Sequence, residues 1–189
     1  KVGASPIKFR NSLGDGTRAL NPTERRHIRR ARRLQGAYAW LATELGRDGI
    51  ELPACSLSDD PVEAAARVRA LLRVSVTRQR DEWKSPSKAF DGWRDALEGL
   101  GVLVFLFPMG TSSVRGFSLW DGQAPVVAIN SAWKDEARIF SMFHELGHLV
   151  TRSSSACAPT TMMTGDSKDK AERWCERFAA ALLIPQKVL

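Results

Sequence analysis

Residues 139–150 read Ile-Phe-Ser-Met-Phe-His-Glu-Leu-Gly-His-Leu-Val, and this stretch decides the fold. Its apolar residues fit one flank of a helix that we expect to be capped by Asn130 or Ser131 and to extend to about residue 150. At about 100° per residue, His144 and His148 lie one turn apart, so both imidazoles can point at one metal ion. Glu145 lies about 100° round from His144, where it can reach a metal-held water. The pattern predicts a zinc site with Glu145 as general base.

A catalytic zinc site needs a third protein ligand beside an open position, and two glutamates downstream are candidates. Both fall on an expected helix that runs from near Ser167 to Leu183. Measured from the centre of that helix's apolar face, Glu172 lies about 70° away and Glu176 about 110° away. The geometry therefore favours Glu172 as the third ligand and leaves Glu176 as a rival.

Three short segments ahead of the His-Glu stretch are expected to be β-strands, at residues 102–107, 114–120 and 125–129. The first is a continuous apolar run, which is typical of a strand covered on both faces. Asp121-Gly122 is a strong turn signal between the other two strands. Because 114–120 is the least apolar segment, we expect it to be the sheet edge that holds an extended substrate. Residues 152–166 are expected to form a loop.

The N-terminal half is expected to be helical. A first helix should start at Asn21-Pro22-Thr23-Glu24, with Asn21 as N-cap, and stop near Gly46. Its predicted apolar face consists of Ile28, Ala31, Leu34, Tyr38, Leu41 and Leu45. Two further helices are expected near residues 61–73 and 87–98.

Together these elements predict an α+β fold, with a small three-stranded sheet packed on the His-Glu helix and a helical region in front. We expect a helical N-terminal extension over residues 1–53 and a zincin-like peptidase domain over residues 54–189.

The chain has 189 residues and a formal net charge of +7, most of it in the N-terminal half. The excess comes mainly from Arg25, Arg26, Arg29, Arg30, Arg32 and Arg33. Such a cluster could contact nucleic-acid phosphate, although it is more often a solvated helix face.

Three widely spaced cysteines predict no disulfide framework, and no apolar run reaches the roughly 20 residues of a membrane helix. We therefore expect a cytoplasmic protein. The first residue is not Met, so we expect a piece of a longer protein.

The two polar motifs also resemble a known family. His144-Glu-Leu-Gly-His148, followed by Glu172-Arg-Trp-Cys-Glu-Arg-Phe178-Ala-Ala-Ala-Leu-Leu-Ile-Pro185, resembles the ImmA/IrrE family of bacterial metallopeptidases. In this resemblance Phe178 and Pro185 fix the register and put the ligand glutamate at Glu172. The sequence departs from the family pattern at Cys175, where Ala is usual, and at Glu176, where Asn is usual.

The resemblance implies a zincin fold with one Zn²⁺ per chain, held by His144, His148 and Glu172, with Glu145 as catalytic base. It implies a protein substrate, a DNA-binding repressor or an antitoxin-like protein, and longer members carry a helix-turn-helix domain ahead of the peptidase. The alternative is a non-catalytic zinc-containing module that acts on DNA or on a protein partner. A domain that serves as toxin or sensor within a larger regulator is a third hypothesis.

Overall fold

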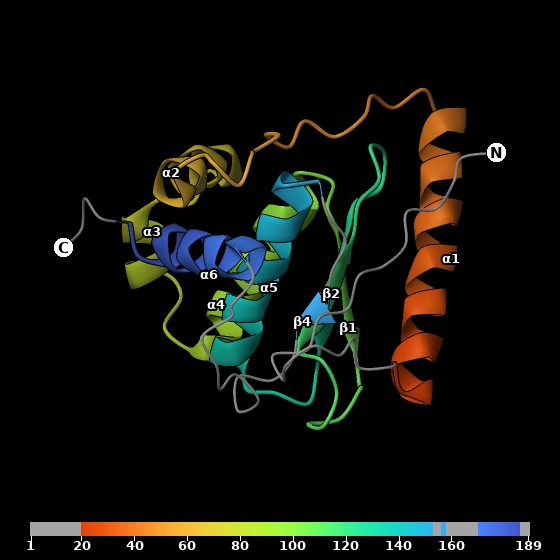
Figure 1. Cartoon of the computed structure of the whole chain (residues 1–189). Helices are drawn as coiled ribbons and strands as arrows, with labels where there is room; N and C mark the ends of the chain where they lie inside the picture. Colours follow the sequence, from red (N-terminus) through yellow and green to blue (C-terminus); the bar gives the residue numbers. More distant parts are fainter. Residues whose placement is uncertain (1–19, 153–155, 158–169, 186–189) are drawn as a thin grey trace.

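The computed structural model describes residues 20–152, 156–157 and 170–185, and these form three layers (Figure 1). Helix α1 (Pro22–Glu44) lies on one face of a small sheet. The other helices lie on the opposite face: α2 (Pro61–Leu72), α3 (Val76–Asp81), α4 (Pro86–Gly99), α5 (Asp135–Val150) and α6 (Lys170–Leu183). The expected α+β class is confirmed.

The sheet has the strand order β1-β3-β2-β4, with β1 at Leu103–Phe107, β3 at Val126–Asn130, β2 at Gly116–Leu119 and β4 at Ala156–Cys157. Strands β1 and β3 are parallel, and β2 is antiparallel to both of its neighbours. The three predicted strands are present, but β4 was not expected, because a two-residue strand is too short to show a period.

Strand β2 is not the free edge that its sequence indicated. Gly116 pairs with Cys157 and Phe117 pairs with Ala156, so β4 covers the first half of β2.

The apolar side chains of the sheet divide between its two faces. Val104, Val127 and Ile129 belong to a core shared with α2, α4, α5 and α6. Phe117 and Ala128 belong to a second, smaller core shared with α1. This two-sided burial explains the continuous apolar run of β1, since both of its faces are covered.

Helix α1 begins as its sequence predicts but turns a different face to the sheet. Asn21 and Glu24 form the reciprocal capping box, and Pro22 is the first helical residue. Of the predicted apolar face, Ile28 and Ala31 are buried. Tyr38 is only half-buried, while Leu34, Leu41 and Leu45 are exposed.

The buried side of α1 is rotated from the predicted one. Beyond Ala31, Ala42 is buried and Gln35 Nε2 donates to the carbonyls of Leu119 and Ala124. At about 100° per residue these three residues share one side of the helix, so the predicted leucines lie on its flank.

Helix α5 begins at Asp135, later than its sequence indicated. Asn130 does not cap it, because its side-chain amide donates to the carbonyls of Gly110 and Val114 instead. Its side-chain oxygen accepts from the backbone of Met109. Asn130 therefore fixes the loop between β1 and β2.

None of the helices in the described ranges combines the length and the apolar content that a membrane crossing requires. The proposed boundary between residues 53 and 54 stays a prediction. Residues 158–166 of the expected loop, and residues 167–169 of the last predicted helix, lie outside the described residues.

Candidate metal centre

Two helices bring three potential metal ligands together. Helix α5 supplies His144 and His148, and the first turn of α6 supplies Glu172. His144 Nε2 lies 3.0 Å from Glu172 Oε2 and 3.2 Å from His148 Nε2, and His148 Nε2 lies 3.4 Å from Glu172 Oε1. Both histidines are buried, while Glu172 is partly exposed. Within the described residues, this is the one group of His, Cys, Asp and Glu side chains close enough to hold a metal ion.

These distances fit a tetrahedral ion. Donors at about 2.0–2.1 Å from a tetrahedral zinc are separated from one another by about 3.3 Å. The two imidazole nitrogens are 3.2 Å apart, and each lies 3.0 or 3.4 Å from the nearer of the two Glu172 carboxylate oxygens. Two imidazoles and a carboxylate are also a ligand set of catalytic zinc sites with an open fourth position. The residues therefore fit a metal in both geometry and chemistry.

The same three side chains perturb one another's pKa values. Burial lowers the pKa of His148, but the Cys175 thiol and the carboxylates of Glu172 and Glu145 raise it well above the usual range. Burial raises the pKa of Glu172, but hydrogen bonds to His144 and His148 and their charge lower it far below the usual range. A proton on His148 paired with an ionised Glu172 thus occupies the metal-free site, and a metal ion must displace that proton.

Glu145 lies on the sheet side of α5 and is fully buried. A Cβ atom on Gly116 of β2 would lie 3.2 Å from Glu145 Cγ and 3.4 Å from Glu145 Oε1. The same Cβ would lie 2.8 Å from the carbonyl oxygen of Ala128. Only a glycine at this position lets the strand pass so close to the carboxylate, a relation that the sequence alone did not indicate.

A second close approach joins the two metal-binding helices. A Cβ on Gly147 would lie 3.0 Å from Cys175 Sγ and 3.2 Å from Cys175 Cα. Cys175 is buried, and burial raises the pKa of its thiol. The sequence marked Cys175 only as a departure from the family motif. Its small size on α6, opposite a glycine on α5, lets the two helices approach closely.

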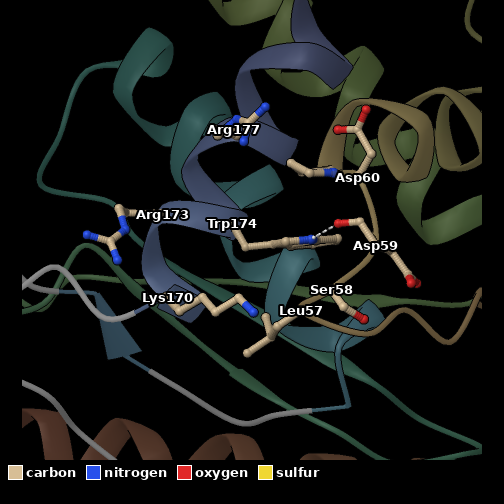
Figure 2. A pocket seen from close by; sticks show the side chains of 9 residues that line it. Leu57, Ser58, Asp59, Asp60, Lys170, Arg173, Trp174 and Arg177 are labelled. Atoms are coloured by element: carbon tan, nitrogen blue, oxygen red, sulfur yellow. Dashed lines mark hydrogen bonds between the residues drawn. The ribbon is translucent and has the colours of Figure 1, made fainter.

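A pocket of about 630 Å³ lies beside α6 (Figure 2). Its lining comprises Leu57, Ser58, Asp59, Asp60, Pro61, Lys170, Arg173, Trp174 and Arg177. Trp174 Nε1 donates to the Asp59 carbonyl, which ties the start of α2 to α6. None of the three donor residues lines it, so we do not assign the chemistry to this pocket.

Of the two downstream glutamates, Glu172 is the one that the structure places beside both histidines. Its carboxylate contacts both histidines, whereas Glu176, one turn further along α6, does not belong to the donor group.

Comparison with known families agrees with this geometry. Residues 97–189 match the family model described as the IrrE N-terminal-like domain of peptidase family M78, and this range contains the sheet, α5 and α6. Searches of curated proteins and of solved structures gave no significant match. The resemblance that the two motifs indicated is therefore confirmed at the level of the family.

Proposed function

Residues 97–189 of this chain belong to the ImmA/IrrE (M78) peptidase family, and from this premise we propose that the protein is a zinc-dependent endopeptidase. The proposal assigns His144, His148 and Glu172 to the metal and Glu145 to catalysis. The observation that carries it is the set of three donor separations, 3.0, 3.2 and 3.4 Å, in a ligand set that suits catalytic zinc.

A zinc ion bound there would supply Lewis acidity, which activates a water molecule and polarises a peptide carbonyl. Glu145 would take the proton of the attacking water and then return it to the leaving amine. Its complete burial against Gly116 supports this role, because a buried carboxylate is held in one position and is shielded from bulk water. A purely structural zinc site has no use for a base in that place.

We propose a specific regulatory protein as substrate, a repressor or an antitoxin-like protein, on the strength of the family membership alone. The substrate would lie extended along β2, because Gly116 of this strand is in contact with Glu145. Since β4 already pairs with Gly116 and Phe117, the substrate would have to extend beyond β4 or replace it.

The test compares the wild type with Glu145→Gln. Elemental analysis should find about one zinc per chain in both proteins, because Glu145 is not a ligand in the proposed site. Cleavage would be followed by mass spectrometry of new termini in an unfolded protein mixture. Loss of the general base should slow cleavage by roughly 10²–10⁴-fold.

Full cleavage by a zinc-loaded Glu145→Gln protein would refute the assigned mechanism. A wild type without stoichiometric metal after reconstitution would refute the zinc site itself, while a zinc-loaded wild type without cleavage would favour the non-catalytic zinc-containing module.

A further inference from the structure

The outward face of α1 carries charge and apolar surface that the fold does not use. Helix α1 contains six arginines and two glutamates, and all six arginines are exposed. Beyond them along the helix, Leu34, Trp40, Leu41 and Leu45 are 41%, 64%, 48% and 61% exposed. We call these ten residues the α1 face: Arg25, Arg26, Arg29, Arg30, Arg32, Arg33, Leu34, Trp40, Leu41 and Leu45.

The arginines of the α1 face are not neutralised within the described part of the chain. No ion pair joins any of their guanidinium groups to a described carboxylate. Arg30 lies over the Phe107 ring at 6.0 Å, and Arg25 donates to the Leu20 carbonyl, but neither contact supplies a negative charge. The helix therefore presents a concentrated positive charge to a partner.

The apolar part of the α1 face follows a helical period. Leu34, Leu41 and Leu45 are spaced by seven and four residues, so they form one stripe along the axis. Single exposed leucines are common, but a stripe of three leucines, with Trp40 exposed about 100° further round the same helix, marks an interaction surface. The stripe lies roughly 40–100° round the helix from Ala31 and Ala42, which are buried, so none of the described residues covers it.

We propose that the α1 face binds an acidic polypeptide that places carboxylates against the arginines and apolar side chains against the leucines and Trp40. Arginine suits this partner because its planar guanidinium binds a carboxylate through two parallel hydrogen bonds. A nucleic-acid backbone would also pair with the arginines, but its phosphates offer nothing to the apolar stripe. The partner class is therefore protein rather than nucleic acid.

This surface lies across the sheet from the proposed catalytic site (Figure 1). A polypeptide bound to α1 leaves α5, α6 and the metal ligands uncovered. The surface is independent of the peptidase proposal, and it would serve a non-catalytic module equally well.

The experiment measures binding of a fluorescein-labelled synthetic helix in which a block of glutamates precedes a block of leucines on one face. Three double variants of the full chain are compared with the wild type. Arg29→Glu with Arg33→Glu tests the charged part, and Leu41→Gln with Leu45→Gln tests the apolar part. Lys84→Glu with Lys88→Glu changes the net charge by the same amount on exposed residues outside α1. Circular dichroism and metal content check that each variant is folded.

Both α1 variants should weaken binding by at least about tenfold, while the Lys84 and Lys88 variant should bind like the wild type. Absence of binding to the wild type would overturn the proposal. Equal weakening by both charge variants, or no effect of Leu41→Gln with Leu45→Gln, would show that net charge alone drives binding. Either outcome would also overturn the proposal.

The same series of variants distinguishes two other possible partners of the α1 face. A DNA duplex that binds more tightly than the peptide, with dependence on the arginines alone, would replace the polypeptide by nucleic acid. Sedimentation that reveals a dimer of the free chain, dissociated by Leu41→Gln with Leu45→Gln, would assign the face to a second copy. Either result contradicts the proposal.

Discussion

The three candidate donor residues come together through the period of one helix and the packing of a second helix against it. His144 and His148 are separated by one turn of α5, and Glu172 reaches them from α6 at 3.0 and 3.4 Å. Glu176 lies on the same helix but outside the donor group. These two glutamates therefore form a matched pair for a test.

Glu172→Ala should remove a ligand and lower metal content to a small fraction of one ion per chain. Glu176→Ala should retain the metal, because its carboxylate is not among the donors. Elemental analysis after dialysis against zinc-free buffer measures both. Loss of metal from Glu176→Ala with retention in Glu172→Ala would reverse the ligand assignment.

A histidine distant from the metal should make folding sensitive to acid. His27 on α1 is 5% exposed and stacks on Phe107, with ring centroids 4.7 Å apart. Burial, and then the charges of Arg26 and Arg30, lower its pKa. The unfolded chain therefore binds a proton more readily at this position, so the contribution of His27 to stability is present above its ordinary pKa of about 6.5 and is lost as pH falls toward the lower folded value.

Urea unfolding of wild type and His27→Phe at pH 7.5 and at pH 5.5 tests this. The phenyl ring keeps the stacking on Phe107 but does not titrate, so the wild type should lose more stability than the variant on acidification. Comparing the two proteins removes the contributions of all titratable groups that they share. An equal loss in both proteins would mean that His27 is not protonated differently in the folded and unfolded states.

At the scale of elements, the sequence predicted correctly those features that depend only on residues close together in the chain. The Asn21–Glu24 capping box and the start of α1 agree with the sequence, and so do the three main strands. The apolar face of α1 was predicted wrongly beyond Ala31, because the side that packs inward passes through Gln35 and Ala42, and a polar glutamine does not add to an apolar period. The short helix α3 and the strand β4 were missed, since both are shorter than the window in which a period can be recognised.

The packing of α5 on α6 rests on a glycine. Gly147→Ala would place a methyl group 3.0 Å from Cys175 Sγ and 3.2 Å from Cys175 Cα, so α6 must shift away from α5. Overpacking costs roughly 1–3 kcal/mol, while the better helix propensity of alanine returns about 1 kcal/mol. The net effect should be a loss of about 1 kcal/mol in unfolding free energy, with weaker metal binding, because Glu172 moves with α6.

Gly36→Ala is the matched control. Gly36 lies inside α1 with no atom within 4 Å of the added methyl position, so this change should stabilise the protein by up to about 1 kcal/mol. Denaturant unfolding and zinc titration measure both variants. A Gly147→Ala protein as stable as Gly36→Ala, with unchanged zinc affinity, would show that the close approach of the helices is not needed.

At the scale of the whole molecule, the site could be predicted further than the fold around it. The grouping of His144, His148 and Glu172 agrees with helical spacing and motif register, both of which are local, while the catalytic role of Glu145 stays a prediction. The closeness of Gly116 to Glu145 could not be predicted, because it depends on how β2 crosses α5, residues 29 positions apart in the chain. Contacts of this kind depend on the packing of layers and leave no periodic trace in the sequence.

Metal should therefore stabilise the whole molecule by joining elements that are distant in sequence. The ligands connect α5, which contacts the sheet, with α6, which packs against α2. A metal ion that binds only the folded chain adds about 2.7 kcal/mol at a hundredfold excess over its Kd. For a chain of this size each kcal/mol corresponds to roughly 2–4 °C, so zinc should raise the Tm by roughly 5–11 °C over the chelator-treated protein.

The metal-free protein should remain folded, because the pair of His148 and Glu172 still satisfies the buried charges. Differential scanning calorimetry of wild type, Glu172→Ala and Glu176→Ala, each with EDTA and with excess zinc, measures the shift. Wild type and Glu176→Ala should gain the full increase in Tm, while Glu172→Ala should gain little, since one of its three ligands is missing. An equal increase in Tm in all three proteins would mean that zinc stabilises the chain by binding at another site. The stabilisation would then not depend on a metal that joins α5 to α6.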